Sequence, residues 1–220
     1  MRLILLGPPG SGKGTQAKLL CSRNHLVHIA TGDILRRAIE ENTPAGARAR
    51  PFMEAGKLVP DELVNGVIAE RFASADRPTR FVMDGYPRSL VQADTFDALL
   101  DRHHLCLAAV VLLTVDDEEI VRRVAGRWVC PKCQTPYHVE SNPPRVPGVC
   151  DLDGMPLEQR PDDRAETVRA RLEVYRNNTA GLARHYRDKG LLREVFASGD
   201  IEGVYQRILE VLRGQAGSSC

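Results

Sequence analysis

A glycine-rich segment near the start of the chain, residues 7–15, has the composition of a loop that binds phosphate groups. Its glycines carry no Cβ atoms to keep a phosphate away from the backbone N–H groups, and they tolerate the left-handed dihedrals that turn those groups inward. Lys13 adds a mobile cation for the outer phosphates. The spacing G-x-x-x-x-G-K-[ST] is met through Lys13, whereas Gly14 occupies the hydroxyl position and Thr15 follows it. We therefore predict that this segment binds the phosphate chain of a nucleotide.

The elements on either side of this segment are those that such a loop requires. Residues 3–6 form a short apolar run that predicts a buried strand, and a helix is expected from residue 13 to residue 23. The N-terminus of that helix would add free amides and the positive end of its dipole to the loop.

A second site is expected near residues 31–33, which read Thr-Gly-Asp. Residues 26–29 predict a short strand, and the three residues after it offer a turn and a helix cap. An ordinary capped helix with a surface arginine, Arg36, would produce the same pattern. Residues 40–60 predict short helices broken by proline and glycine, which indicates a small excursion from the sheet.

An acidic residue and an arginine follow a further predicted strand, residues 80–83. Asp84 comes at the carboxyl end of that strand, where nucleotide-binding proteins hold Mg²⁺ or its waters. Arg88 follows a turn made rigid by Pro87, and it would reach over the same edge of the sheet, where ligands of open α/β sheets bind. The alternative for Arg88 is a surface arginine on a loop.

Two further arginines follow the most continuous apolar run, residues 107–115, which predicts a central parallel strand. An acidic helix start comes next, and Arg123 and Arg127 are expected four residues apart on one face of that helix. Like charges at this spacing repel unless an anion lies between them. The pattern indicates an anion site, and a solvated basic helix end is the alternative.

Three cysteines have the spacing of metal ligands. Cys130 and Cys133 form a C-x-x-C knuckle, and Cys150 and Asp153 form a second knuckle with a carboxylate in place of the fourth thiolate. We predict a closed tetrahedral zinc site made of these four residues, with His138 in reserve. A metal staple would explain how a flap of about 30 residues with little core of its own stays folded. A reduced, empty knuckle is the alternative.

The composition is that of a globular enzyme. With 220 residues, 43% of them apolar, we expect one main domain with inserted pieces. The net charge of +1 provides no general attraction for nucleic acid or membranes. The apolar run after Arg2 is interrupted at Gly7, and no run reaches the ~18 apolar residues of a membrane span. We expect a cytoplasmic protein with a loose tail from residue 214.

The later elements complete an alternating pattern. Residues 191–196 predict a fifth strand, a long helix is expected before it, and Asp200 is expected to cap a final amphipathic helix. Strands that alternate with helices predict an α/β fold with a doubly wound parallel sheet of five strands.

Several motifs together resemble adenylate kinase in the long form with a metal-bearing lid: GPPGSGKGT, TGD at 31 to 33, DGYPR at 84 to 88, GR at 126 to 127 and RPDD at 160 to 163. The resemblance covers essentially the whole chain. It implies a P-loop NTPase-like core of residues 1–29, 60–125 and 164–220. It also implies a helical insert for the monophosphate, residues 30–59, and a lid, residues 126–163. It implies a monomer that transfers a phosphoryl group between ATP and AMP, with Mg²⁺, to give two ADP.

The resemblance also assigns residues by position. The residues similar to the AMP-binding set are Thr31, Arg36, Lys57, Leu58, Val59, Gly85, Tyr86, Pro87, Arg88, Gln92, Arg160 and Arg171. Those similar to the ATP-binding set are Gly10, Ser11, Gly12, Lys13, Gly14, Thr15, Arg123, Arg127, the Pro136-Tyr137 turn and the backbone near Gly199. The expected catalytic residues, which surround the moving phosphoryl group with charge or position Mg²⁺, are Lys13, Arg88, Arg123, Arg160, Arg171 and Asp84.

Two other functions share parts of this pattern. Another nucleoside monophosphate kinase, acting on GTP and AMP or on UMP and CMP, would have the same core, although Thr31 and Gln92 favour AMP. A P-loop regulator with a nucleic-acid-binding zinc ribbon would explain the cysteines, but the near-neutral charge and 5% aromatic content disfavour it.

Overall fold

This computed structural model describes residues 1–163 and 165–214, and a β-sheet lies at its centre. Over these residues, five parallel strands follow the order β2-β3-β1-β4-β7. Their bounds are β1 Arg2–Leu6, β2 Val27–Ala30, β3 Phe81–Asp84, β4 Ala109–Thr114 and β7 Leu192–Phe196. The predicted fold class is confirmed. The predicted tail, apart from Gly214, falls outside the described residues.

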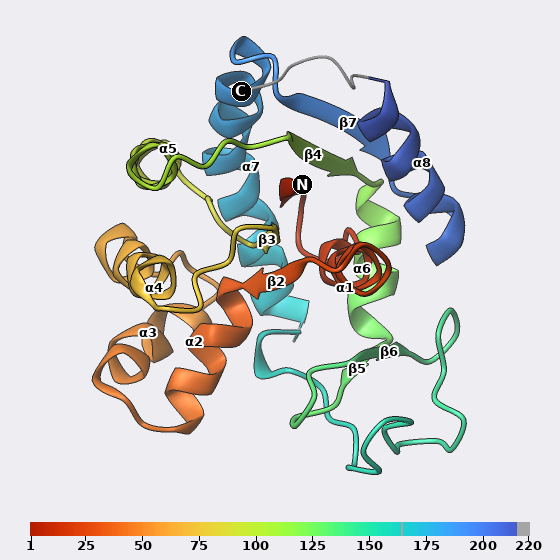
Figure 1. Ribbon diagram of the computed structural model, residues 1–220. Coiled ribbons are helices and arrows are strands. Elements are labelled where there is room, and N and C mark those ends of the chain that lie inside the picture. The colour runs from red at the N-terminus through yellow and green to blue at the C-terminus, as the bar shows by residue number, and fades with distance from the viewer. Residues whose placement is uncertain (164, 215–220) are drawn as a thin grey trace.

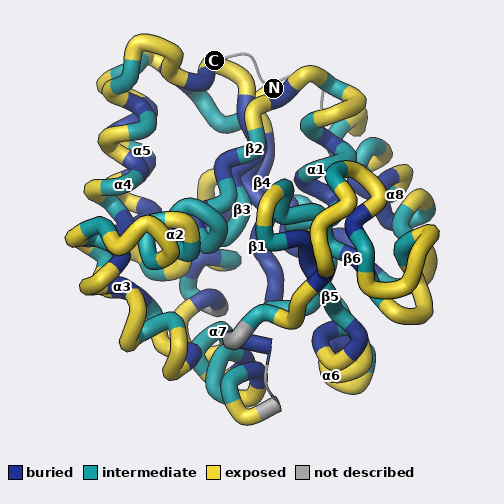
Figure 2. The backbone as a smooth tube through the Cα atoms, turned by 90° about the horizontal axis from the view of Figure 1, so that it is seen from below, coloured by how far each residue is buried: buried dark blue, intermediate teal, exposed yellow. Residues whose placement is uncertain are grey.

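Helices cover both faces of the sheet (Figure 1). They are α1 Lys13–Asn24, α2 Thr31–Glu40, α3 Pro44–Glu54, α4 Asp61–Ala73, α5 Leu90–Arg102, α6 Asp117–Ala125, α7 Ala165–Asp188 and α8 Ile201–Arg213. Successive side chains of a strand point to opposite faces. Leu3 and Leu5 therefore pack in the cluster that includes α1 and α8, whereas Ile4 and Leu6 pack in the cluster that includes α4, α5 and α7. Figure 2 shows the buried strands between the exposed outer faces of the helices.

Two segments extend from this core. In the first, residues 30–59, α2 packs against α3. The helix cap predicted at residues 31–33 is wrong. α2 begins at Thr31 itself, after Ala30, with no side-chain cap. The Thr31 hydroxyl instead donates to the carbonyl oxygen of Gly85, at 2.9 Å, because the parallel pairing of β2 with β3 brings the ends of both strands together.

The second segment, residues 126–163, holds an antiparallel pair of short strands, β5 Arg127–Val129 and β6 Pro136–His138. Pro136 and Tyr137 therefore lie in a strand and not in the predicted turn. The helix α6 ends at Ala125, so Arg127 opens β5 and does not share a helix face with Arg123. A 3₁₀ turn at Pro161–Asp163 leads back to the core. None of the helices within the described ranges has both the length and the apolar content that a membrane span requires.

Candidate active site

A cavity of about 800 Å³ lies at the carboxyl ends of the strands and is lined by the core and by both extended segments. The glycine-rich loop forms one part of its wall, and the turn after β3 forms another. All the predicted nucleotide-binding residues line it except Tyr86. The fold thus gathers into one space residues that are up to 189 positions apart, from Gly10 to Gly199.

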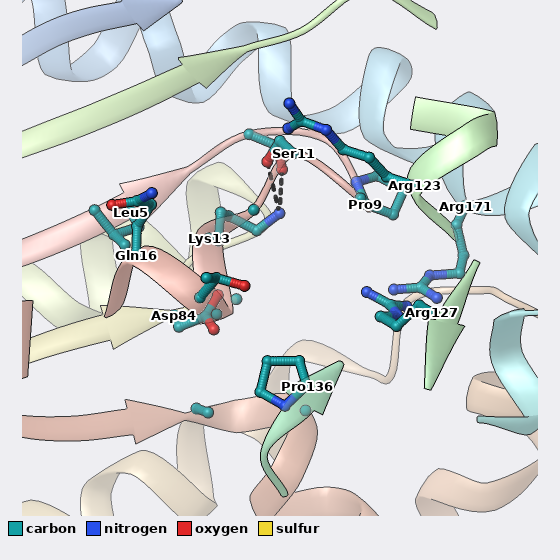
Figure 3. A pocket seen from close by; sticks show the side chains of 18 of the residues that line it. Leu5, Pro9, Ser11, Lys13, Gln16, Asp84, Arg123, Arg127, Pro136 and Arg171 are labelled. Atoms are coloured by element: carbon teal, nitrogen blue, oxygen red, sulfur yellow. Dashed lines mark hydrogen bonds between the residues drawn. The ribbon is translucent and has the colours of Figure 1, made fainter. Parts of the chain in front are cut away.

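The glycine-rich loop needs glycine at its first position. Gly7 has φ +146°, and a Cβ there would lie 2.7 Å from the carbonyl oxygen of Leu113 on the neighbouring strand. Lys13 folds back over the loop (Figure 3). Its Nζ donates to the carbonyl oxygens of Gly7, at 2.8 Å, and Pro8, at 2.7 Å. Burial lowers the pKa of Lys13 to about 7, although Asp84 partly opposes this shift. The negative charge near the Lys13 ammonium therefore does not offset its burial, and a bound phosphate chain would supply what is missing.

Asp84 ends β3 beside the loop. Its Oδ2 lies 3.5 Å from Nε2 of His28, which lies within the neighbouring strand β2. Burial by itself would raise the pKa of Asp84, but His28 and the Lys13 ammonium outweigh burial and hold this pKa below its ordinary value. Asp84 is therefore an ionised carboxylate next to a phosphate-binding loop. A hard oxygen ligand of this kind fits Mg²⁺ or the waters around it.

Arginines from separate elements reach the same cavity. Asp33, in the first turn of α2, accepts from Arg36 at 2.5 Å and from Arg160 at 3.1 Å. Burial, together with the nearby Arg36 and Arg127, lowers the pKa of Arg160 to about 10. The Nε atoms of Arg36 and Arg160 are buried and have no hydrogen-bond partner within the described part of the chain. Both guanidinium groups thus retain donors for a ligand.

A second pair of acids holds the arginines on the other side. Asp163, whose side chain is 2% exposed, accepts from Nε of Arg127 at 2.7 Å. Asp162 accepts from Nη1 of Arg171 at 2.8 Å. Burial opposes the charge of Arg127, but the bond to Asp163 more than compensates and raises the pKa of Arg127. Figure 3 shows Arg127 and Arg171 across the cavity from Lys13 and Asp84.

Arg88 is placed by the turn before it. Its Nε donates to the carbonyl oxygen of Gly85 at 2.7 Å, and its backbone N–H donates to the side chain of Gln92 at 2.8 Å. Gln92 in turn donates to Asp61 at 2.7 Å, so its amide holds the turn in shape. Although part of the Arg88 side chain faces the open cavity, loss of surrounding water and the nearby Arg171 lower the pKa of Arg88 to about 10.

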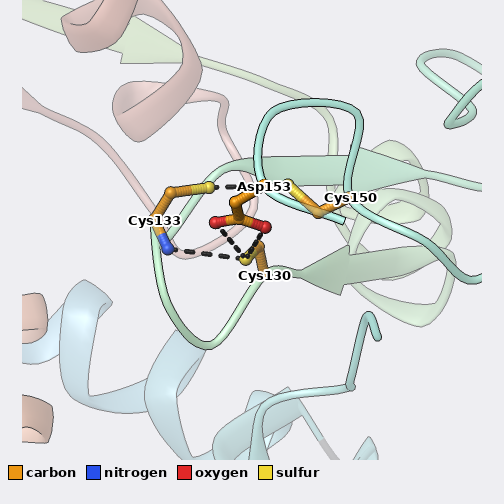
Figure 4. A group of neighbouring side chains, drawn as sticks. All are labelled: Cys130, Cys133, Cys150 and Asp153. Carbon is orange, nitrogen blue, oxygen red and sulfur yellow. Dashed lines mark hydrogen bonds between the residues drawn. The ribbon is translucent and has the colours of Figure 1, made fainter. Parts of the chain in front are cut away.

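A candidate metal centre lies apart from this cavity. Ligand atoms of Cys130, Cys133, Cys150 and Asp153 all lie within 4.8 Å of one another (Figure 4). The sulfur atoms of Cys133 and Cys150 are 3.6 Å apart, and Cys130 Sγ lies 3.3 Å from both carboxylate oxygens of Asp153. A tetrahedral zinc ion with Zn–S bonds of about 2.3 Å requires sulfur atoms roughly 3.8 Å apart, so the donor set fits zinc. His138 lies outside this group, and its Nδ1 accepts from the backbone of Ser141 at 3.1 Å.

Comparison with known proteins agrees with this geometry. The family model described as adenylate kinase matches residues 5–191. The chain belongs to the adenylate kinase family.

Proteins named adenylate kinase resemble the chain over nearly its full length. That of Geotalea daltonii is 47% identical over 214 residues, which are 97% of this chain and 100% of the relative. That of Syntrophotalea carbinolica is 50% identical over 212 residues, 96% of this chain and 98% of the relative. That of Acidothermus cellulolyticus is 47% identical over 213 residues, 97% of this chain and 98% of the relative. As a member of the adenylate kinase family, the chain is a nucleoside monophosphate kinase.

One residue carried over from adenylate kinases does not reach the cavity. The Tyr86 side chain is 1% exposed and packs edge-on against Phe96, with ring centroids 5.4 Å apart. Its hydroxyl donates to Asn65 at 2.7 Å and to the carbonyl oxygen of Gln92 at 3.1 Å. Tyr86 therefore supports the turn that carries Arg88 from the core side.

Sequence reasoning missed the acids that hold the arginines of this adenylate kinase-family site. Asp33 lies in the TGD motif, and Asp162 and Asp163 lie in the RPDD motif, yet only the threonine and the arginine of these motifs were predicted to belong to the site. The signal was present, because several arginines that share one cavity need counter-ions. What the motifs do not contain is the pairing of each acid with its arginine.

Proposed function

We propose that the protein catalyses reversible, Mg²⁺-dependent phosphoryl transfer, ATP + AMP = 2 ADP, and so balances the adenine nucleotides of the cell. The observation that carries this proposal is the single cavity between the glycine-rich loop and the turn of Arg88, with arginines around its middle. Two anionic chains laid end to end would match this order of groups. A site for one nucleotide alone would not need a second cationic end.

In this proposal, ATP lies along the loop. The residues that would bind it are Gly10, Ser11, Gly12, Lys13, Gly14, Thr15, Arg123, Arg127, Pro136, Tyr137 and Gly199. The loop amides and Lys13 bind the phosphates, because the free N–H groups at the start of α1 and the ammonium group both favour anions. The backbone near Gly199 lies beside the adenine ring.

AMP lies across the cavity from ATP. The residues that would bind it are Thr31, Arg36, Lys57, Leu58, Val59, Gly85, Pro87, Arg88, Gln92, Arg160 and Arg171. Arg36 and Arg88 bind the monophosphate, since planar guanidinium groups match its oxygens. Tyr86 and Gln92 keep the Arg88 turn in place, and besides its bonds to Arg88 and Asp61 the Gln92 amide has a second N–H and a second oxygen lone pair for a ligand.

The chemistry needs no general base. Phosphoryl transfer passes through a loose transition state, so the protein has to align the two oxygens and surround the moving group with positive charge. Lys13, Arg88, Arg123, Arg160 and Arg171 supply that charge. Asp84 would hold Mg²⁺ or its waters, and the ion would supply further positive charge and orientation.

Water has to be excluded during transfer, because an open site would hydrolyse ATP. We propose three functional parts for this reason: a core of residues 1–29, 60–125 and 164–220, an AMP-binding insert of residues 30–59, and a lid of residues 126–163. Insert and lid close over the substrates, and lid motion limits turnover. Equal rates in the first and in later turnovers would contradict that limit.

The lid contains a structural zinc ion in this proposal. Cys130, Cys133, Cys150 and Asp153 would hold it, and the fit of their separations to a tetrahedron is the support. Zinc would compensate for the small size of the lid core, which is formed by Cys130, Tyr137, Cys150 and Leu157. We further propose that the protein acts as a cytoplasmic monomer.

The test is ADP formation from ATP with AMP, GMP, UMP or CMP, in the wild type and in Arg88→Ala, with zinc counted per chain. We expect ADP to form from ATP only when AMP is the acceptor. We also expect Arg88→Ala to lower kcat by about 10²–10³, the usual effect of removing one group that stabilises transition-state charge. Arg37→Ala, which removes an arginine with a 78% exposed side chain, serves as the control. Transfer to another monophosphate at a comparable rate would overturn the assignment of AMP.

A further inference from the structure

Lys18 joins the helix of the phosphate-binding loop to the metal-binding knuckle. It lies on α1, five residues after Lys13, and its Nζ donates to the carbonyl oxygen of Gln134 at 2.7 Å. The same Nζ lies 3.5 Å from the carbonyl oxygen of Cys133. One charged side chain of the core is thus bound to the backbone of residues 126–163.

The acceptors of this contact are held in place within the knuckle. Gln134 has a positive φ of 56°, and its N–H donates to the carbonyl oxygen of Cys130 at 3.0 Å. Its side-chain amide donates to Pro131 at 2.8 Å, and the N–H of Cys133 points to the sulfur of Cys130 at 3.4 Å. These bonds fix the peptide groups whose oxygens face Lys18.

Charge favours the same contact. Three thiolates and one carboxylate carry more negative charge than a divalent ion neutralises, so a loaded knuckle keeps an excess of negative charge. The Lys18 ammonium is the cation of α1 that contacts this knuckle. Lys18 also lines the cavity itself.

We propose that Lys18 is a positioning residue that holds the lid over the ATP end of the cavity. The inference rests on the proposed function, because it assigns ATP to that end. Lys18 and Lys13 share one helix, so the contact aligns the lid with the loop that holds the phosphates. The bond between Arg160 and Asp33 joins the end of the lid to the insert, whereas Lys18 joins the lid to the core. For the lid to open and uncover the ATP end of the cavity, the Lys18 hydrogen bonds therefore have to break.

The test compares Lys18→Met with Lys18→Arg, which keeps the charge and the donors. A matched control is Lys132→Met, which removes an exposed lysine from the same knuckle. The measurements are KM for ATP, KM for AMP, kcat and the dissociation rate of a two-headed adenosine pentaphosphate, all with the zinc-loaded protein. A variant that was merely less stable would show a lower active fraction with unchanged KM values.

We expect Lys18→Met to raise KM for ATP and the dissociation rate by about tenfold, near the lower end of the effect of losing one hydrogen bond to a charged group. KM for AMP should not rise, and kcat should not fall. Lys18→Arg should recover most of the loss, and Lys132→Met should match the wild type.

An unchanged dissociation rate in Lys18→Met, or equal loss in Lys18→Met and Lys132→Met, overturns the proposal. If the wild type fails to bind the two-headed ligand, the proposed function falls and this inference with it. Normal wild-type binding with an unaltered Lys18→Met overturns this inference alone.

Discussion

Arg160, near the end of residues 126–163, donates a hydrogen bond of 3.1 Å to Asp33, in the first turn of α2. The same carboxylate accepts from Arg36 at 2.5 Å, so one acid holds two arginines that the chain separates by more than a hundred residues. Each arginine keeps a buried Nε without a protein partner within the described residues. Asp33 therefore aims two cations at a ligand without using up their donors.

Replacing Asp33 by asparagine should lower kcat/KM for AMP by about tenfold. Arg36 and Arg160 would then lack their shared anion and repel each other, and reordering them would cost part of the AMP binding energy. Steady-state rates with AMP varied at saturating ATP provide the measurement. Glu41→Gln removes an exposed ion pair with Arg37 from the same helix and should change little. Tighter AMP binding by Asp33→Asn would mean that the carboxylate competes with the phosphate.

Removing Asp163 should lower the stability of the protein more than removing an exposed acid does. Its side chain is 2% exposed and pairs with Arg127 and Arg171, so Asp163→Ala leaves the partly buried Arg127 without its ion-pair partner, whereas Arg171 keeps Asp162. We expect the free energy of unfolding in urea to fall by about 3 kcal/mol. Asp117→Ala, which breaks an exposed pair with Arg176, should cost less than about 1 kcal/mol. Equal losses would show that the pairs of Asp163 are no stronger than a surface pair.

Binding of the ATP phosphates should take up a proton at pH 8. The pKa of Lys13 in the free protein is lowered to about 7, first by burial, so at pH 8 the amine is mostly neutral. Bound phosphates favour the ammonium and raise this pKa again. Uptake should be nearly one proton at pH 8 and almost none at pH 6, as measured by calorimetry of a non-hydrolysable ATP analogue in two buffers of different ionisation enthalpy. Lys13→Arg stays protonated at both pH values and should remove the uptake. The same uptake in Lys13→Arg would assign the proton to another group.

Loss of one ligand should empty the metal centre. Cys150→Ser should lower the zinc content from about one ion per chain to near zero, because a closed site needs all four donors. Trp128, the single tryptophan of the chain, packs against the cluster of Cys130, Tyr137, Cys150 and Leu157, so its fluorescence should shift as that cluster loosens. Cys21→Ser, on α1, should keep both the metal and the spectrum. Full zinc content in Cys150→Ser would refute the proposed ligand set.

The local parts of the fold could be predicted well because their signals lie within a few neighbouring residues. The apolar run before Gly7 forms β1, and the longest apolar run forms β4, since a strand buried on both faces needs continuous apolar side chains. Asp200 caps α8 as predicted, with its carboxylate accepting from the N–H of Gly203 at 2.7 Å. The spacing within each of the two knuckles likewise predicted the group that Cys130, Cys133, Cys150 and Asp153 form.

Predictions failed where a tertiary partner competes with a local one. Thr31 has the side chain of a helix cap, but the carbonyl oxygen of Gly85 on the neighbouring strand takes its hydroxyl. Arg127 lies four residues after Arg123, yet the helix stops before it, and Asp163 binds it from the far end of residues 126–163. Tyr86 belongs to a motif of the site, but its ring packs into the core.

The amino-acid order alone accounts for the residue types: glycines for a phosphate loop, cysteines for a metal, arginines for anions and apolar runs for a parallel sheet. Each of these depends on the chemistry of a side chain or on a short repeat, and neither changes with the fold. Only the folded chain decides which acid holds which arginine, that Lys18 reaches the knuckle, and that Tyr86 turns inward. Those outcomes depend on distances between residues that are remote in sequence, and such distances are set when the strands align their carboxyl ends around one cavity.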